Sequence, residues 1–483
     1  MVIYHSIRKL AGFGCIKRSV PALPFQWAAW VDRSIINVAY LNDFTFFLKM
    51  KGLAMKSTAS CYLALREYIE TLPVIDCHDH TLAMGPKPTD PVKAVIDWYM
   101  RSDLISASSD REVEIIFNEK LPLEERWPVL ERAWRRSKHT GYAQVVRRAL
   151  RAFYQEPDLT LEGLRRIAEK MIDFSDEANF TAALDKAHIV ARLADNWPDL
   201  KGFIAGKVKM PPRSRLMIPL PGFHNLYNAN QVQGIAGIID QHVTSLDEYV
   251  AACREIFTRL KAAGAVGFKD QSAYERTLAY GMPTRQEAEE AFNWLMADPR
   301  RSLSYPDGAR PLSDYLFHHF MRMARDLDLP VQLHTGHMAG IRNEITKTNA
   351  VHLTSLLELH RETRFDLFHA NWPYSGEILF LLKNYPNVAL DFCWAHMIDP
   401  LYSQNLLKQA VSSAPHAKIH GYGSDLDGSM VPSAWAHADL AKDNIAMALA
   451  DLVEIDYLGV DEAKELALDW LFRNPNEFFK LGC

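Results

Sequence analysis

Val74-Ile75-Asp76-Cys77-His78-Asp79-His80 is the stretch of sequence from which both the fold and the site can be worked out. Pro73 precedes it, and its first residues form an apolar run short enough for a buried strand. Side chains alternate along a strand, so His78 and His80 project from the same face. Two imidazoles that converge at one strand end make half of a metal site. Because His-x-His pairs also arise by chance, the interpretation depends on ligands supplied elsewhere in the chain.

Length and composition indicate a globular protein with a large core. The chain has 483 residues, of which 48% are hydrophobic and 23% charged. Its net charge of −5 gives no reason to expect nucleic acid or a membrane surface as a partner. No apolar run approaches the ~20 residues that span a bilayer. Six cysteines without paired spacing favour reduced thiols and a cytoplasmic protein: Cys15, Cys61, Cys77, Cys253, Cys393 and Cys483.

The first 54 residues differ in composition from the rest of the chain. They carry seven Lys or Arg residues against only Asp32 and Asp43. Such a basic segment can be a targeting peptide, but this one lacks the compact apolar core and cleavage site of a secretory signal. The alternative is an over-extended start, with Met50 or Met55 as the natural first residue. We favour this alternative and expect residues 1–54 to be a poorly ordered extension of a catalytic domain over residues 55–483.

Helical patterns lie on both sides of the first strand. Tyr62, Leu65, Ile69 and Leu72 suit a short amphipathic helix over residues 57–72. Residues 91–185 place apolar side chains at helical spacing among many Arg and Glu residues. We therefore expect an α-helical insertion after strand 1 that could cap a site. Its expected core positions include Trp98, Ile105, Ile116, Trp127, Leu130, Trp134, Val146, Leu150 and Phe153.

Beyond residue 187, short apolar runs alternate with helical patterns. The expected strands are His188–Leu193, Leu216–Leu220, Ala265–Phe268, Val331–Leu333, Phe365–Phe368, Val388–Phe392 and Lys418–Tyr422. The expected helices between them include Leu246–Ala263, Leu312–Leu327, Leu353–Glu362, Ser375–Asn384 and Leu401–Ser413. Together with the first strand, this alternation predicts an α/β fold, a (β/α)₈ TIM barrel with a helical insertion after strand 1.

Titratable side chains follow several of these strands. Barrel enzymes build their sites at the carboxyl ends of the strands, where all of these side chains would meet. Each alone is more often a structural residue, but six at the same end of the barrel indicate a metal site. They are His78 and His80 after strand 1, Lys269 after strand 4, His334 after strand 5, His369 after strand 6 and Asp425 after strand 8.

This pattern of strand-end residues resembles the amidohydrolase superfamily. The resemblance covers about residues 57–483 and includes the closing segment Asn474-Pro-Asn-Glu-Phe-Phe-Lys-Leu481. Longer runs are similar to the amidohydrolase-related (amidohydrolase 2) branch, which includes domains linked to glutamine-synthetase-like proteins. Uronate isomerases and metal-dependent decarboxylases are more distant members. The runs are Val266-Gly-Phe-Lys-Asp-Gln-Ser-Ala-Tyr-Glu-Arg276, Leu333-His-Thr-Gly-His337 and Phe368-His-Ala-Asn-Trp-Pro-Tyr374.

Neutral imidazoles and a carboxylate suit a borderline divalent cation, zinc first and manganese second. We hypothesise that His78, His80, His334 and Asp425 bind it. A bound cation lowers the pKa of water towards ~7 and polarises a carbonyl group. As catalytic residues, Asp425 would accept the proton of that water, and His369 would hold metal or stabilise an oxyanion.

Lys269 has two interpretations. In binuclear members of the superfamily the lysine after strand 4 is carbamylated and bridges two metals. The residues that follow Lys269 look more like branches in which it does not, and we favour an ammonium group that binds an anionic substrate beside a single metal. An ion pair with Asp270 or Asp425 is the structural alternative. The full set of predicted substrate-binding residues is Lys269, Tyr274, Arg276, His337, Arg342, Trp372 and Trp394.

The resemblance implies a metal-dependent hydrolase that cleaves a C–N or C–O bond in an amide, a γ-glutamyl conjugate or a lactone. The alternative is a uronate isomerase-like or decarboxylase-like enzyme on the same barrel, because metal, His and Asp serve each of these reactions. A non-catalytic domain would be expected to lack ligands, and none is missing. A small polar, anionic molecule is the expected partner, and a homo-oligomer is left open.

Overall fold

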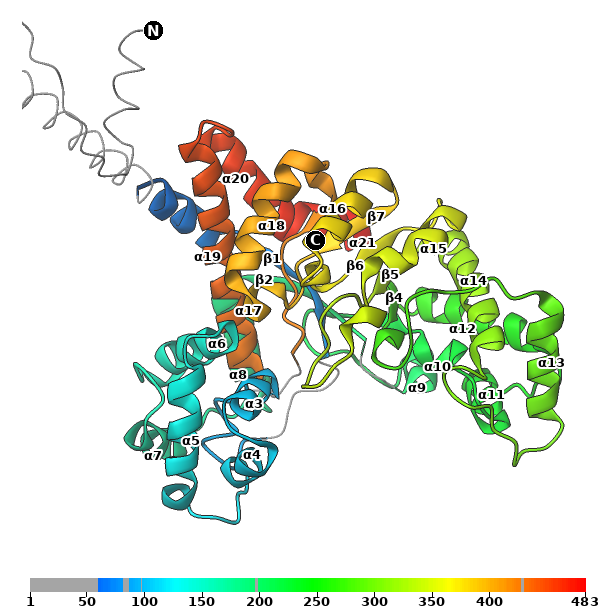
Figure 1. Ribbon diagram of the computed structural model, residues 1–483, viewed down its shortest axis with the longest axis horizontal. Helices are drawn as coiled ribbons and strands as arrows, with labels where there is room; N and C mark the ends of the chain where they lie inside the picture. Colours follow the sequence, from blue (N-terminus) through cyan, green and yellow to red (C-terminus); the bar gives the residue numbers. More distant parts are fainter. Residues whose placement is uncertain (1–59, 81–86, 97, 196–198, 427–429) are drawn as a thin grey trace, which may run out of the picture. The chain divides into compact units, whose positions relative to one another are not determined.

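Figure 1 shows the computed structural model, which describes residues 60–80, 87–96, 98–195, 199–426 and 430–483. The extension predicted over residues 1–54 lies outside the described residues. Eight parallel strands form one sheet, in which each strand pairs with the next along the chain. The predicted TIM barrel is therefore confirmed. The strands are β1 (Val74–Asp79), β2 (Ile189–Ala194), β3 (Ser214–Pro219), β4 (Gly267–Asp270), β5 (Val331–Leu333), β6 (Phe365–Leu367), β7 (Val388–Asp391) and β8 (Ile419–His420).

The barrel closes between β1 and the segment that follows β8. The Cys77 amide donates to the Tyr422 carbonyl at 3.0 Å, and the Asp425 amide donates to the His78 carbonyl at 2.8 Å. The His80 amide then donates to the Leu426 carbonyl at 3.1 Å. Because β8 itself has only two residues, these bonds beyond its end join the last strand to the first.

Helices alternate with the strands from β2 onward. Capping residues and glycines in the sequence account for where the longer helices begin and end. In the helix over Leu246–Ala262, for example, Ser245 and Glu248 form a capping box, and Gly264 follows the helix with a φ of +108°. These helices are α9 (Leu200–Ile204), α10 (Pro221–His224), α11 (Ala229–Ala236), α12 (Leu246–Ala262), α13 (Arg285–Met296), α14 (Arg310–Asp326), α15 (Thr354–Leu359), α16 (Ser375–Asn384), α17 (Ala395–Ile398), α18 (Pro400–Ser413), α19 (Val431–Glu454), α20 (Val460–Leu468) and α21 (Asn474–Phe479).

Among the described residues between β1 and β2, where the sequence predicts an insertion, there are six α-helices and a short π-helix (Leu150–Tyr154). Most of its expected core positions are buried or half-buried, but Trp98 is 64% exposed and is a wrong prediction. Trp98 begins the first of these helices, where the Arg101 guanidinium lies 5.6 Å from its ring on the surface. The helices are α3 (Trp98–Ala107), α4 (Asp110–Ile116), α5 (Leu123–Ser137), α6 (Gly141–Ala149), α7 (Leu161–Glu169) and α8 (Glu177–Ala187).

The inserted helices share a hydrophobic core with the loops at the carboxyl ends of the strands. Tyr99 on α3 and Tyr142 on α6 pack against Trp394, which follows β7. The Tyr99 hydroxyl also donates to the Asp425 carbonyl at 2.6 Å. The insertion is thus in direct contact with the end of the barrel where the strand-end residues meet.

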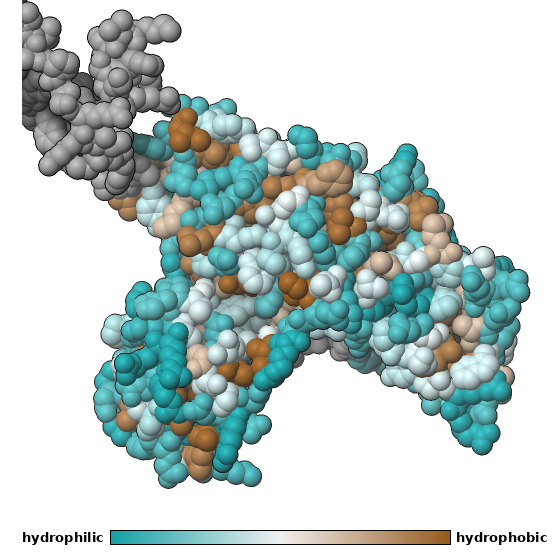
Figure 2. All heavy atoms as spheres, in the orientation of Figure 1, coloured by the Kyte–Doolittle hydropathy of each residue, from teal (hydrophilic) through white to brown (hydrophobic). Residues whose placement is uncertain are grey.

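Among the described residues, every helix is too short or too polar to cross a membrane. Figure 2 shows a mainly hydrophilic face on which apolar residues form small, scattered patches.

Gly141 fixes the distance between the insertion and the barrel. A Cβ added to Gly141 would overlap the Met397 carbonyl on α17, whereas a Cβ at Gly376 on α16 would meet nothing within 4 Å. We expect Gly141→Ala to lower the free energy of unfolding by about 1–3 kcal/mol, because α6 must move away from α17. Gly376→Ala should leave it unchanged or raise it slightly. Denaturant unfolding of both variants tests this, and equal stabilities would contradict close packing of α6 on α17.

Candidate metal centre

The end of β1 brings two histidines to a carboxylate from the last strand. His80 Nε2 lies 2.9 Å from Asp425 Oδ1, and His78 Nε2 lies 3.5 Å from the same oxygen. One donor atom from each of the three lies within 4.8 Å of the others. Asp425 has a φ of +55°, which turns the chain sharply after β8 and directs the carboxylate to this point.

The His78 imidazole is buried, and neither ring nitrogen has a hydrogen-bond partner among the described residues. Burial and the nearby Lys269 ammonium hold the pKa of His78 well below its usual value, so the ring is neutral. A buried polar ring without partners is costly unless another group satisfies it. A neutral imidazole with a free lone pair is the form that binds a metal.

His334 and His369 present lone pairs to each other. His334 Nε2 donates to the His337 carbonyl at 2.8 Å, and His369 Nδ1 donates to the Cys393 carbonyl at 3.0 Å. The remaining nitrogens, His334 Nδ1 and His369 Nε2, face each other at 3.1 Å. Burial lowers the pKa of His334 well below its usual value and that of His369 to about 3, so both rings are neutral. Two facing lone pairs repel, and a bound cation would relieve this repulsion.

Asp195 belongs to the same cluster, although it is absent from the predicted set. It follows β2 directly, is fully buried, and accepts a hydrogen bond from His80 Nδ1 at 2.8 Å. Burial alone would raise its pKa, but His78 and His80 lower it to about 2, so it is a carboxylate. A carboxylate that binds the second nitrogen of a histidine fixes the ring for metal binding. Like the predicted residues, Asp195 is a titratable residue directly after an apolar strand, so the same criterion could have identified it.

Cys393, which follows β7, is a second residue that the predicted set lacks. Its sulfur lies within 4.8 Å of donor atoms of His369 and Asp425, so Asp425 belongs to two possible groups of ligands. His369 Nε2 lies 3.8 Å from Asp425 Oδ2. The position of Cys393 after a strand could have identified it, but the scattered cysteines suggested only free thiols.

Lys269 lies inside this cluster and has no ion-pair or hydrogen-bond partner for its ammonium among the described residues. Its Nζ lies 3.4 Å from the centre of the Phe368 ring, and the side chain is buried. Burial lowers its pKa, while Asp195 and Asp425 raise it, with a net decrease. The structural alternative, an ion pair with Asp270 or Asp425, is not formed among the described residues. Asp270 instead accepts hydrogen bonds from His224, Ser272 and Tyr280.

Four predicted substrate-binding residues surround the cluster in the loops after the strands. Tyr274 lies with its ring 4.8 Å from that of His334, and its hydroxyl accepts a bond from the Ala339 amide. The His337 ring lies between those of Trp372 and Trp394, at 5.2 and 4.9 Å. Trp394 is fully buried against the insertion, so its contacts are those of a packing residue.

The two predicted arginines are already paired. Arg276 is buried, with its guanidinium 2.5 Å from an Asp314 carboxylate oxygen on α14 and 4.5 Å from the Tyr280 ring. Arg342 is exposed and forms an ion pair at 2.6 Å with Asp110 on α4 of the insertion. The structure therefore places Lys269, but neither arginine, among the histidines, and substrate binding by the arginines stays a prediction.

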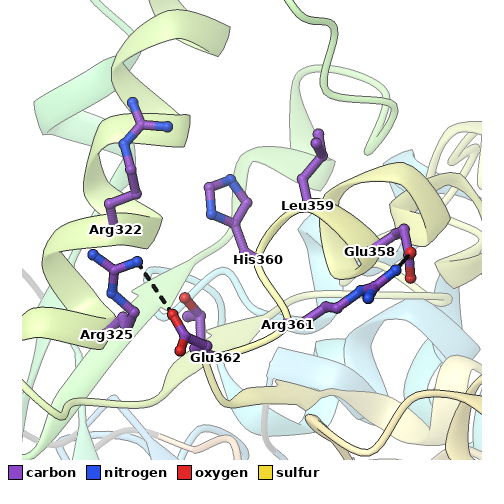
Figure 3. A pocket seen from close by; sticks show the side chains of 8 residues that line it. Arg322, Arg325, Glu358, Leu359, His360, Arg361 and Glu362 are labelled. Atoms are coloured by element: carbon purple, nitrogen blue, oxygen red, sulfur yellow. Dashed lines mark hydrogen bonds and ion pairs between the residues drawn. The ribbon is translucent and has the colours of Figure 1, made fainter.

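A pocket of about 320 Å³ lies on the surface between α14 and the end of α15. In Figure 3, Arg325 points to Glu362 and Arg361 to Glu358, so two of its three arginines are neutralised. None of the strand-end residues lines it. Its one histidine, His360, has Nε2 2.9 Å from His318 Nδ1, and the pocket is therefore not a candidate for the reaction.

The donor set fits a divalent metal. Three neutral imidazoles with free nitrogens and a buried carboxylate are the ligands of zinc and similar cations. His78, His80 and Asp425 would hold the cation, with His334 and His369 on the neighbouring side. Asp425 is ionised: burial alone would raise its pKa, but the hydrogen bond and charge of His80 hold that pKa well below the usual value.

Asp195→Asn tests the orientation of His80. An amide in place of the carboxylate would weaken the bond to His80 Nδ1, and we expect metal affinity to fall about 10–100-fold. Chelator competition on purified protein measures this. Asp240→Asn is the control, because Asp240 is exposed and its carboxylate pairs with Lys201. Unchanged affinity in Asp195→Asn would show that this carboxylate does not support the metal ligands.

Comparisons with known proteins agree with this architecture. A family model described as amidohydrolase matches residues 228–482. Protein fluG of Emericella nidulans is 27% identical over 180 residues, which are 36% of this chain and 20% of fluG. The uronate isomerase of Xanthomonas axonopodis pv. citri is 25% identical over 273 residues, 52% of this chain and 56% of that protein. The chain thus matches about a fifth of one relative and just over half of the other.

A solved structure extends the likeness over most of the barrel. The uronate isomerase of Thermotoga maritima superposes with a TM-score of 0.71 at 13% sequence identity. The superposition covers 87% of this chain and 97% of that protein. At this identity the likeness supports the fold alone.

Proposed function

Because the chain belongs to the amidohydrolase family, we propose that it is a metal-dependent enzyme that hydrolyses a C–N or C–O bond. The proposed substrate is a small, polar, anionic molecule with an amide, a γ-glutamyl linkage or a lactone. A cytoplasmic location is part of the proposal and is supported by the scattered cysteines of the sequence.

One observation carries the proposal. Four imidazoles and the Asp425 carboxylate meet at the carboxyl ends of the strands, and three imidazole nitrogens there bear lone pairs without a proton donor. In a buried histidine with a structural role, both ring nitrogens normally form hydrogen bonds. A set of unsatisfied, neutral donors around one carboxylate supports a centre built to hold a cation, with zinc first and manganese second.

The residues of the chain divide the work between binding and proton transfer. A divalent cation, when bound, supplies an activated water and polarises the group under attack. Asp425 is ionised and lies beside His78 and His80, so it can accept the proton of the attacking water and return it to the leaving group. His80 is held in place by Asp195 throughout.

Lys269 supports an anionic substrate. Its buried ammonium has no carboxylate within ion-pair distance among the described residues, so a substrate carboxylate could neutralise it. A carbamate on the same nitrogen would serve instead to bridge two metals, and intact mass measurement separates the two cases.

A second candidate is isomerisation of a uronate on the same barrel. One of the two similar proteins named above, that of Xanthomonas axonopodis pv. citri, is a uronate isomerase, which favours this alternative over a decarboxylase. In either reaction, the Lys269 ammonium group can bind an anionic group of the substrate. Asp425 can act as the base that transfers a proton.

Metal dependence is the first test of the proposal. We expect chelator treatment to abolish turnover and zinc or manganese to restore it. His78→Ala and Asp425→Asn should lower kcat/KM by about 10²–10⁴-fold, as expected for loss of a ligand or a proton acceptor. His416→Ala is the control, because His416 is exposed, precedes the amino end of β8 and lies beside Asp469, whereas the candidate ligands lie at the carboxyl ends of the strands. Metal-free protein with full activity would exclude the proposal.

The reaction type is decided by product mass on a panel of lactones, γ-glutamyl amides and uronates. Hydrolysis adds one water to the substrate, whereas isomerisation leaves its mass unchanged. We expect Lys269→Gln to raise KM for an anionic substrate about 10–100-fold, because a charge-assisted bond is lost. Lys442→Gln removes another buried lysine, one that lies beside Glu70, and should leave KM unchanged. Equal effects of both variants would contradict substrate binding by Lys269.

A further inference from the structure

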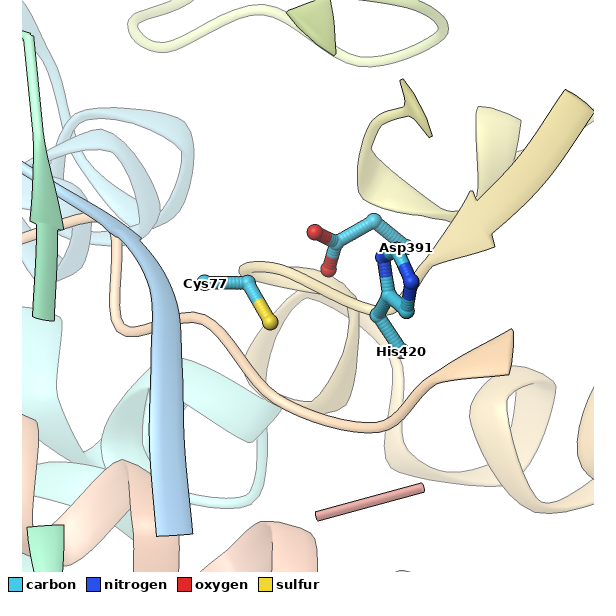
Figure 4. Close-up of side chains that lie close together, drawn as sticks. All are labelled: Cys77, Asp391 and His420. Atoms are coloured by element: carbon cyan, nitrogen blue, oxygen red, sulfur yellow. The ribbon is translucent and has the colours of Figure 1, made fainter. Parts of the chain in front are cut away.

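A second group of possible ligands lies inside the barrel, one residue before His78 on β1. Cys77 Sγ, an Asp391 carboxylate oxygen on β7 and a His420 ring nitrogen on β8 lie within 4.8 Å of one another. All three side chains are fully buried. Figure 4 shows the sulfur of Cys77 directed from its strand towards Asp391 and His420.

Hydrogen bonds across the barrel place this group in the interior. Gln332 on β5 donates through Nε2 to the Cys77 carbonyl on β1 at 2.9 Å. β1 and β5 lie opposite each other in a barrel of eight strands, so this bond crosses the interior. The same amide nitrogen donates to Asp366 Oδ2 on β6 at 3.0 Å. The group therefore belongs to a polar layer enclosed by the strands.

The hydrogen bonds of this layer do not use all the lone pairs of the three possible ligand atoms. His420 Nδ1 donates to Asp366 Oδ1 at 2.9 Å, which leaves a lone pair on Nε2. His420 Nε2 is buried and has no hydrogen-bond partner among the described residues. No N–H or hydroxyl group of those residues donates to Asp391 Oδ2, although the Asp391 carboxyl also interacts with that of Asp366. Cys77 Sγ makes only a long contact of 3.8 Å to the Ile75 carbonyl. An imidazole held by a carboxylate on one nitrogen and free on the other is the usual arrangement of a metal-bound histidine.

We propose that Cys77, Asp391 and His420 bind a zinc-like divalent cation inside the barrel, separate from the centre formed by His78, His80 and Asp425. Atoms at most 4.8 Å apart can all lie within about 2.8 Å of one point, and small side-chain movements would bring them to the ~2.0–2.3 Å of zinc–ligand bonds. A thiolate with nitrogen and oxygen ligands selects zinc over magnesium or calcium. Binding releases the Cys77 thiol proton to solvent, and the Asp391 proton if that carboxyl carries one.

The inner cation would join the strands where the barrel closes. Cys77 is on β1, while Asp391 and His420 are paired neighbours on β7 and β8. β8 is only two residues long and forms few backbone hydrogen bonds. A cation bound by Cys77 on β1 and His420 on β8 would hold these two strands together. The role is structural, and the inner site does not depend on the proposed reaction.

Metal content separates the two sites. The measurement is zinc per chain in full-length protein, made on the wild type, on His80→Ala/Asp425→Asn and on Cys77→Ser. We expect the first variant to keep one zinc and the second to lose that zinc while retaining metal at the outer centre. Cys253→Ser is the matched control, because Cys253 is equally buried but lies on α12. A His80→Ala/Asp425→Asn protein without zinc would overturn the proposal.

Cobalt substitution in the same His80→Ala/Asp425→Asn background identifies the sulfur ligand. We expect a thiolate-to-cobalt charge-transfer absorption that disappears in Cys77→Ser and persists in Cys393→Ser and Cys253→Ser. If the absorption depends on Cys393 instead, the sulfur belongs to the outer centre and the inner site is refuted.

Anomalous scattering at the zinc edge from wild-type crystals keeps the proposal testable even if a variant does not fold. A peak between Cys77, Asp391 and His420 is expected. An ordered zinc at the outer centre alone would refute the inner site and leave the proposed function standing. A peak at the inner site alone would support the inner site and count against the proposed metal-dependent function of the outer centre.

Discussion

Closure of the barrel between β1 and the segment after β8 is the constraint on which the site depends. The Asp425 amide donates to the His78 carbonyl, so the bond that closes the sheet also places the carboxylate beside the imidazole. Ser424 adds a second link, because its amide donates to Asp76 Oδ1 at 2.7 Å. A metal centre needs its ligands within fractions of an ångström. Here that precision comes from backbone pairing, which fixes His78 and Asp425 before any cation binds.

A buried charge holds β1 from its other side. Arg192 on β2 is fully buried, with its Nε 2.9 Å from Asp79 Oδ2 and 3.6 Å from Asp76 Oδ2. Removing one partner of such a pair typically costs about 3–5 kcal/mol, because the other charge is left uncompensated. The carboxyl groups of Asp76 and Asp79 and the Arg192 guanidinium thus stabilise the pairing of β1 with β2, next to the closure with β8. The run Asp76-Cys77-His78-Asp79, in which the pairing with β2 is irregular, therefore combines support of the barrel with ligands for the site.

Local patterns predicted the barrel well, because each strand and helix carries its own signal. The expected strand Val331–Leu333 and helix Ser375–Asn384 coincide with β5 and α16. The partners of side chains could not be predicted in this way. Arg276 meets Asp314 from a helix 38 positions further on, and Trp394 is buried by Tyr99 and Tyr142 of the insertion. Such contacts depend on how distant segments pack, which spacing along the chain does not encode.

The tautomer of His369 narrows the chemistry that the centre can perform. Its Nδ1 proton is donated to the Cys393 carbonyl, and its Nε2 faces His334 Nδ1, which bears a lone pair as well. With its only proton committed to the backbone and a pKa of about 3, His369 cannot donate to a developing oxyanion near neutral pH. The geometry therefore supports the ligand role for His369 over the oxyanion role. Stabilisation of negative charge then falls to the cation and to Lys269, and proton transfer falls to Asp425.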